Sequence, residues 1–216
     1  SSSASTSTDA LPPPASSVSA DPRAVCVYCA SSPGLSPEYR KAAESLGAAL
    51  AASSRTLIYG GGDRGLMGIV SNTVIENSGK AMGIIPRSLI LAGGEGRGPV
   101  ERAASQATVE QIEQGARNVK KDVAVVNSGN MQTIVVNSMH ERKLQMARIA
   151  GAGFVTLPGG FGTYEEVLEA ITWSQIGINQ KPVIVLNVNG FYEPLRTLID
   201  GAIKEAFIQE NGRRLV

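Results

Sequence analysis

The stretch from Leu157 to Glu166 constrains the fold of this chain more than any other. An apolar run over residues 154–157 leads into a turn with three glycines, and a helical pattern of apolar residues follows from 167 to 171. A strand that turns through glycines into a helix leaves backbone N–H groups at the positive end of the helix dipole, which favours a bound phosphate. Two carboxylates, Glu165 and Glu166, lie just inside that helix. Their presence indicates chemistry on a phosphorylated substrate rather than binding alone.

Short apolar runs alternate with amphipathic segments along the rest of the chain. We expect strands at 24–30, 56–60, 81–86, 132–137, 153–157 and 182–188, and helices at 37–52, 65–77, 138–150, 163–176 and 192–208. Continuously apolar strands between such helices are typical of a parallel sheet that is covered on both faces. The sequence therefore predicts an α/β fold: a Rossmann-like, doubly wound parallel sheet in a single domain. Ligands of such sheets bind at the carboxyl ends of the strands.

Composition sets the limits of this prediction. The chain has 216 residues and 43% hydrophobic content, enough for one sizeable core. A net charge of +1 does not favour a nucleic-acid partner, and no apolar run approaches the ~20 residues that span a bilayer. Residues 1–23 are rich in Ser and Pro and lack an apolar signal region, so we expect a disordered tail and a cytoplasmic protein. We assign residues 24–216 to the domain and residues 91–131, which are polar and glycine-containing, to an insertion.

Cys26 and Cys29 form a C-x-x-C motif, which raises the hypothesis of a redox pair or a metal site. Residues 25–30 are expected to form a buried strand, in which residues three apart point to opposite faces. The two Cα atoms would lie roughly 10 Å apart in an extended chain, beyond the ~7 Å limit for a disulfide. Because the chain has one histidine, a zinc site is also poorly supplied. We therefore expect two structural cysteines and no metal site.

A second glycine cluster spans residues 60–68 and contains the pattern G-x-G-x-x-G. Its place after a strand and before a helix raises the hypothesis of a dinucleotide site. The next strand ends at Pro86-Arg87, where an NAD site would need an acidic side chain, although Arg87 would suit a 2′-phosphate. The alternative is a tight strand-to-helix turn in which the backbone approaches a ligand or its neighbour closely, and we favour it.

The predicted helix at 138–150 begins with Ser138 and Glu141 spaced as a capping box. On the helical wheel His140 points away from the face that carries Arg142 and Lys143, so we expect it to play a structural role. A mostly apolar face that contains two cations either presents a cationic edge to a cleft or lets both stems snorkel to water. The spacing leaves both interpretations open. The residues of this face are Met139, Arg142, Lys143 and Met146.

Glu166 also has two interpretations. Thr163 and Glu166 are spaced as a capping box, with Thr163 as the N-cap, and this explains Glu166 about as well as catalysis does. Glu165 lies about 100° around the helix from Glu166, so we expect the two carboxylates to have different roles.

Two motifs in this order make the chain recognisable. Residues 158–166 match P-G-G-x-G-T-x-x-E, and residues 139–143 match M-H-x-R-K. Together with Cys29-Ala30-Ser31-Ser32 and the glycine cluster at 60–68, they make the chain resemble the Lonely Guy family of cytokinin riboside 5′-monophosphate phosphoribohydrolases. The resemblance runs from about Val25 to about Ile208. The departures are the long tail and the segment 91–131, which is longer than the family pattern.

The resemblance implies hydrolysis of the N-glycosidic bond of a cytokinin nucleotide, with AMP as a further candidate substrate. It implies no cofactor, no membrane contact and a homodimer, for which the apolar residues Trp173, Ile176 and Ile178 are candidate interface positions. Arg142 and Glu166 are the catalytic residues that it implies. The substrate-binding residues are Ser31, Gly61, Gly62, Met139, Lys143, Gly159, Gly160, Phe161, Gly162, Thr163 and Glu165.

The chemistry of these residue types agrees with the implied roles. Cleavage of an N-ribosidic bond develops oxocarbenium character on the sugar, which a carboxylate such as Glu166 stabilises. Glu166 could act on its own or form a covalent ribosyl intermediate, and the sequence leaves both open. Arg142 stays protonated, so it is expected to orient Glu166 or the substrate through a forked hydrogen bond. The remote 5′-phosphate would fix the ribose in the reactive geometry, so we expect monophosphates to be preferred over nucleosides.

Three other functions are weighed against this one. A nucleotide carrier built on the same turn would bind AMP without turnover, and the pair Arg142 and Glu166 argues against it. An NAD(P)-dependent oxidoreductase would rest on the glycine pattern alone. Related chains are labelled lysine decarboxylases, but that chemistry needs a pyridoxal cofactor on a Schiff-base lysine, for which the sequence has no motif.

Overall fold

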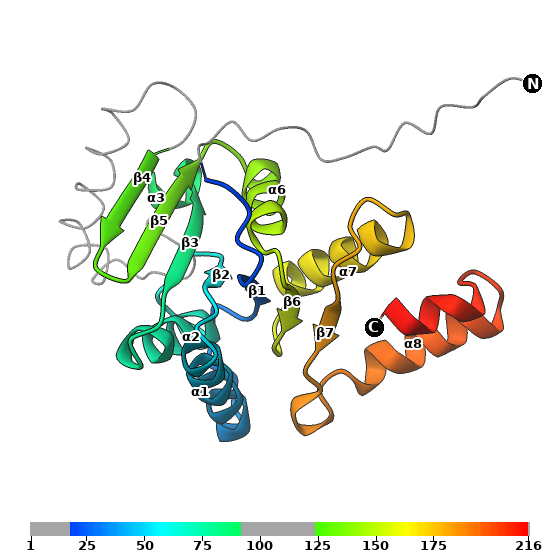
Figure 1. Ribbon diagram of the computed structural model, residues 1–216. Coiled ribbons are helices and arrows are strands. Elements are labelled where there is room, and N and C mark those ends of the chain that lie inside the picture. The colour runs from blue at the N-terminus through cyan, green and yellow to red at the C-terminus, as the bar shows by residue number, and fades with distance from the viewer. Residues whose placement is uncertain (1–17, 92–123, 216) are drawn as a thin grey trace, which may run out of the picture.

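The computed structural model describes residues 18–91 and 124–215. Within them one seven-stranded sheet forms the centre of the molecule, in the order β4-β5-β3-β2-β1-β6-β7 (Figure 1). The strands are β1 (Val25–Tyr28), β2 (Leu57–Tyr59), β3 (Ala81–Pro86), β4 (Ala124–Ser128), β5 (Met131–Val136), β6 (Gly153–Thr156) and β7 (Val183–Val185). The helices are α1 (Pro37–Ala52), α2 (Gly65–Glu76), α3 (Arg87–Leu91), α6 (Met139–Ile149), α7 (Phe161–Gln175) and α8 (Glu193–Lys204), with 3-10 turns η1 (Val188–Gly190) and η2 (Glu210–Leu215).

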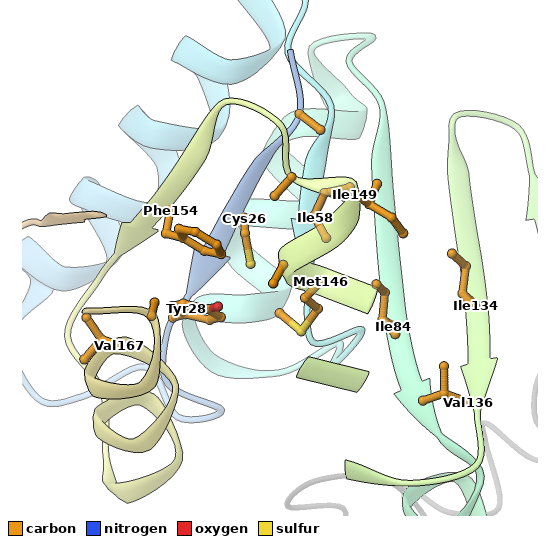
Figure 2. Packing of buried hydrophobic residues seen from close by; sticks show 14 residues of the cluster. Cys26, Tyr28, Ile58, Ile84, Ile134, Val136, Met146, Ile149, Phe154 and Val167 are labelled. Atoms are coloured by element: carbon orange, nitrogen blue, oxygen red, sulfur yellow. The ribbon is translucent and has the colours of Figure 1, made fainter. Parts of the chain in front are cut away.

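Helices cover both faces of the sheet, because the strands bury side chains in both directions. Cys26 and Tyr28 of β1 face α6 and α7, where they join a core with Phe154, Met146 and Val167 (Figure 2). The alternate residues of the same strand belong to a second core, built with α1 and α2. Continuous apolar strands between two helical layers are what a doubly wound sheet requires. The predicted fold class is therefore confirmed.

The order of the strands reverses between β1 and β6, which are parallel neighbours. The chain moves outward from β1 through β2, β3 and β5, then returns to form β6 and β7 on the other side. Backbone hydrogen bonds join the carboxyl ends of the central strands: Leu157 N–H donates to Tyr28 O at 2.9 Å, and Ala30 N–H donates to Pro158 O at 3.2 Å. A crevice at such a reversal is the expected ligand site of an open α/β sheet.

Strand β4 is the main difference from the predicted elements. It pairs antiparallel with β5 through a hairpin at Gly129-Asn130, inside the segment 91–131 that we assigned to an insertion. The cluster 127–130 is a hairpin signal between two apolar runs, and the surrounding polar sequence concealed it. Short α3 was also not predicted. The expected tail up to residue 17 and positions 92–123 of the expected insertion lie outside the described residues.

The C-x-x-C motif behaves as strand geometry predicts. Cys26 and Cys29 are both buried and do not form a disulfide, and they belong to the cores on opposite faces of the sheet. In the part of the chain that the structure describes, no helix has both the length and the apolar character needed to cross a membrane.

Candidate active site

A cavity of about 260 Å³ opens at the carboxyl ends of β1, β2 and β6, at the point where the strand order reverses. The starts of α6 and α7 form its other walls. It brings together the two motifs that carry the sequence resemblance. Its lining residues are Val27, Cys29, Ala30, Ser31, Ser32, Gly60, Met67, Met139, Arg142, Gly160, Phe161, Gly162, Thr163, Glu165 and Glu166.

Helix α7 begins earlier than predicted, and this changes the interpretation of Glu166. Gly160, with an extended backbone (φ −104°, ψ −156°), is the N-cap, and the first helical residue is Phe161. The expectation that Thr163 caps the helix is therefore wrong, because a glycine without a side chain takes that position. Thr163 is the third residue of the helix and packs over Gly159, so closely that a methyl group there would lie 2.5 Å from Thr163 Cβ. The capping explanation of Glu166 fails with it.

The start of α7, from its N-cap Gly160 to Gly162, is open on its outer side. A Cβ added to Gly160 or Gly162 would meet no atom within 4 Å, and the ring of Phe161 is 93% exposed. The first N–H groups of an α-helix have no intrahelical acceptor and lie at its positive end. Space beside such N–H groups suits an anion of the size of a phosphate.

Arg142 is buried on the opposite wall. Ser138 caps α6 by accepting from Glu141 N–H at 3.1 Å, as predicted, and this begins the helix one turn before Arg142. Arg142 lines the cavity and is only 4% exposed, so its stem does not snorkel to water. The interpretation of a cationic edge at a cleft therefore holds for Arg142, but not for Lys143, which is absent from the lining. Arg142 Nη2 lies 4.0 Å from Glu166 Oε1. This is the distance of an ion pair. A forked hydrogen bond from Arg142 to the substrate, the other expected arrangement, stays a prediction.

The charge of Glu166 acts on two buried groups of β1, Cys26 and Tyr28. Burial, followed by the charge of Glu166, raises the pKa of the Cys26 thiol well above its usual value. Burial, followed by the charges of Cys26 and Glu166, does the same to the pKa of the Tyr28 phenol. Both groups therefore stay protonated and uncharged at neutral pH.

Lys143 does not line the cavity, and it joins α6 to α7. Its Nζ donates to Glu165 Oε1 and, at 3.0 Å, to Glu169 Oε1. Burial opposes the charge of Lys143, but the hydrogen bonds to Glu165 and Glu169 outweigh it and raise the pKa of the amine. His140 is exposed and lies outside the lining, as the helical wheel predicted.

The structure brings most of the predicted site residues to one cavity. Ser31, Met139, Phe161, Thr163, Glu165 and the two open glycines line it with Arg142 and Glu166, whereas four described residues, Gly61, Gly62, Lys143 and Gly159, do not. Sequence reasoning missed six lining residues, although all six fall in segments that it singled out: Val27, Cys29, Ala30, Ser32, Gly60 and Met67. The functional roles of the predicted residues stay predictions.

The glycine cluster at 60–68 packs against the protein itself. Gly61 has φ +78°, and a Cβ there would lie 2.7 Å from Ile85 Cδ1. A Cβ on Gly65 (φ +56°) would lie 2.6 Å from Ser31 O, and one on Gly68 would lie 2.6 Å from the Asp63 carbonyl carbon. These contacts are those of a tight turn, the alternative that we favoured over a dinucleotide site.

Comparisons with known proteins agree with this geometry. A family model described as "Possible lysine decarboxylase" matches residues 67–216, and the SLOG cluster4 family model matches residues 23–90. The chain is 41% identical over 194 residues to cytokinin riboside 5′-monophosphate phosphoribohydrolase LOG of Oryza sativa subsp. japonica, covering 90% of this chain and 67% of that protein. It is also 41% identical over 194 residues to LOG2 of Arabidopsis thaliana, a protein of the same description, covering 90% and 76%.

Among solved structures, the molybdenum cofactor binding protein of the phototrophic bacterium Rippkaea orientalis is similar, with a TM-score of 0.51 at 20% identity. The match covers 83% of this chain and 85% of that one. At this identity the similarity supports the fold alone.

Proposed function

We propose that this chain, which belongs to the family of cytokinin riboside 5′-monophosphate phosphoribohydrolases, hydrolyses the N-glycosidic bond of cytokinin nucleotides, with AMP as a further candidate substrate. One observation carries the proposal. A buried arginine and a carboxylate, Arg142 and Glu166, form an ion pair in the same cavity as an open glycine turn at a helix N-terminus. The turn suits a phosphate, and the pair suits the sugar next to it.

The 5′-phosphate binds at the turn of residues 160–163 in this proposal. Backbone N–H groups and the dipole of α7 attract the anion, and the space outside Gly160 and Gly162 admits it. Because the phosphate is remote from the bond that breaks, its binding energy serves to fix the ribose against Glu166. The lining residues Ser31, Met139 and Glu165 are the proposed contacts of the rest of the nucleotide.

The reaction breaks the bond between the anomeric carbon and the base nitrogen. The electron pair leaves with the base, which takes up a proton, and positive charge develops on the sugar. Glu166 stabilises that charge, either as a neighbouring carboxylate while water attacks or as a nucleophile that water later displaces. Arg142 keeps its proton throughout and positions Glu166 and the substrate. Water supplies the anomeric hydroxyl of ribose 5-phosphate. The other product is the free base.

Chromatography of the products tests this proposal. Wild type, Glu166→Gln and the surface control Glu44→Gln are incubated with N6-isopentenyladenosine 5′-monophosphate, AMP and the matching nucleoside, without added cofactor. We expect wild type and the control to release base from monophosphates, and Glu166→Gln to lose at least about 100-fold in kcat. Binding of the nucleotide without release of base in wild type would contradict the proposal and favour a nucleotide carrier.

A homodimer in the cytosol is part of the proposal. Large apolar side chains are exposed on α7, β7 and α8, among them Ile176 (61%), Ile184 (49%) and Leu198 (69%), and a second copy would cover such residues. That Cys26 and Cys29 form no disulfide fits a reducing compartment. Sedimentation equilibrium tests the assembly, and a monomer at micromolar concentration would contradict it.

A further inference from the structure

Gly60 follows directly on β2 and faces the buried guanidinium of Arg142. A Cβ added at this position would overlap Arg142 Nη2 and would lie 3.1 Å from Arg142 Cζ. The next nearest atom is Met67 Sδ at 3.2 Å, which a small adjustment of a flexible side chain relieves. The guanidinium is thus the atom group that a side chain at Gly60 would displace.

The backbone of Gly60 does not itself require glycine. Positive φ angles occur at Gly61 and Gly65 in the same turn but not at Gly60, so alanine suits the local backbone. The fold can therefore tolerate a methyl group at Gly60 if the end of the Arg142 side chain moves. Any such movement takes place inside a cavity wall, because Arg142 is 4% exposed.

We infer that Gly60 is a positioning residue of the reaction: its missing side chain reserves the space in which the Arg142 guanidinium lies beside Glu166. The inference rests on the proposed function for its effect on activity. A methyl group would shift the guanidinium that now lies 4.0 Å from Glu166 Oε1, and it would do so without removing any charged group. The first glycine of the cluster therefore serves the active site, whereas its neighbours serve the packing of the turn.

The test compares Gly60→Ala in two backgrounds, with base release from N6-isopentenyladenosine 5′-monophosphate measured in single turnovers. In the wild-type background we expect a loss of about 100-fold, the order expected for a displacement of about 1 Å in a reacting pair. In the Arg142→Ala background the same change should cost less than about twofold, because the group that it displaces is gone. Equal losses in both backgrounds would overturn the inference.

Two further measurements keep the result unambiguous. The thermal midpoint of Gly60→Ala should match that of the control Gly201→Ala, a helical position with no atom within 4 Å of an added Cβ. If Gly60→Ala fails to fold, the double variant with Arg142→Ala should fold, and failure of both would overturn the inference.

A crystal structure of Gly60→Ala separates this inference from the proposed function. If wild type releases no base, the proposed function fails, while a displaced Arg142 guanidinium would still support the role of Gly60. A guanidinium that stays beside Glu166 would overturn that role whatever the activity.

Discussion

The two glycine turns of this molecule use the same residue for opposite purposes. In the turn after β2, residues 60–68, added methyl groups would strike the protein's own atoms: Ile85 at Gly61, the loop after β1 at Gly65, and the backbone of Asp63 at Gly68. In the turn after β6, added methyl groups at Gly160 and Gly162 would meet nothing within 4 Å. The first turn is crowded. The second is open at Gly160 and Gly162, although not at Gly159, where an added Cβ would lie 2.5 Å from Thr163 Cβ.

The difference shows where a ligand belongs. Glycine in a crowded turn allows segments to approach each other, and Met67 N–H can then donate to Ala30 O at 3.2 Å, which joins α2 to the loop after β1. Glycine in an open turn keeps space and N–H groups available to something that is not part of the chain. A glycine motif alone does not distinguish these cases, and the surroundings of each Cβ position do.

The largest expected effect is that of Gly65→Ala on stability. This residue has φ +56°, and its added Cβ would overlap the backbone between Ser31 and Ser32. Left-handed strain and a backbone collision together should lower the free energy of unfolding by about 3 kcal/mol. Urea denaturation measures the change, with Gly201→Ala as the control. A loss below about 0.5 kcal/mol would contradict the claim that the turn after β2 is crowded.

The open turn should respond in the opposite way. Gly162→Ala places a methyl group where we propose that phosphate binds, so the Kd for AMP should rise about tenfold, which is about 1.4 kcal/mol. The free energy of unfolding should change by no more than about 0.5 kcal/mol, since alanine is favourable in a helix. Isothermal titration and urea denaturation of the same preparation check both values. A fall in stability as large as that of Gly65→Ala would contradict the distinction.

Tyr192 holds the backbone that leads into the open turn by a hydrogen bond. It is 4% exposed, and its hydroxyl donates to Leu157 O at 2.8 Å, just before the turn begins. Tyr192→Phe keeps the ring but loses this hydrogen bond, so we expect a loss of about 1 kcal/mol in the free energy of unfolding. Tyr39→Phe, a change in the same group of aromatic rings, is the matched control. Equal effects of the two variants would show that the hydroxyl does not support the turn.

The smallest effect concerns the ion pairs of Lys143 that join the helices carrying Arg142 and the open turn. The pKa of Lys143 is raised above 10.5 in the folded protein, so the ion pairs contribute stability below that pH and lose it as the pH rises through the folded value. Because Glu165 is half exposed, we expect only about 0.5 kcal/mol. The stability difference between wild type and Lys143→Met should stay constant up to about pH 9.5 and shrink at higher pH. A difference that does not shrink would show that the charge of Lys143 contributes nothing.

The sequence predicted the fold and most of the residues that line the cavity, because both depend on local sequence patterns. Continuous apolar runs predicted β1, β3 and β6, and the motif at 158–166 predicted the open turn. Sequence reasoning missed the N-cap at Gly160, because glycine has no side chain that could identify it as a cap in the sequence. It did not foresee that Lys143 contacts Glu165 and Glu169, which lie 22 and 26 residues further along the chain, and a contact of Lys143 with the substrate stays a prediction. Contacts of this kind depend on how α6 and α7 pack, which no local spacing encodes.

The central claim is that the open turn binds the 5′-phosphate of a nucleotide whose N-glycosidic bond is cleaved at Arg142 and Glu166. The most direct measurement is the ratio of kcat/KM for N6-isopentenyladenosine 5′-monophosphate to that for the nucleoside, in wild type and Gly162→Ala. Two or three charge-assisted hydrogen bonds to phosphate predict a ratio of about 1000 in wild type, reduced about tenfold in the variant. Equal turnover of nucleotide and nucleoside by wild type would contradict the account.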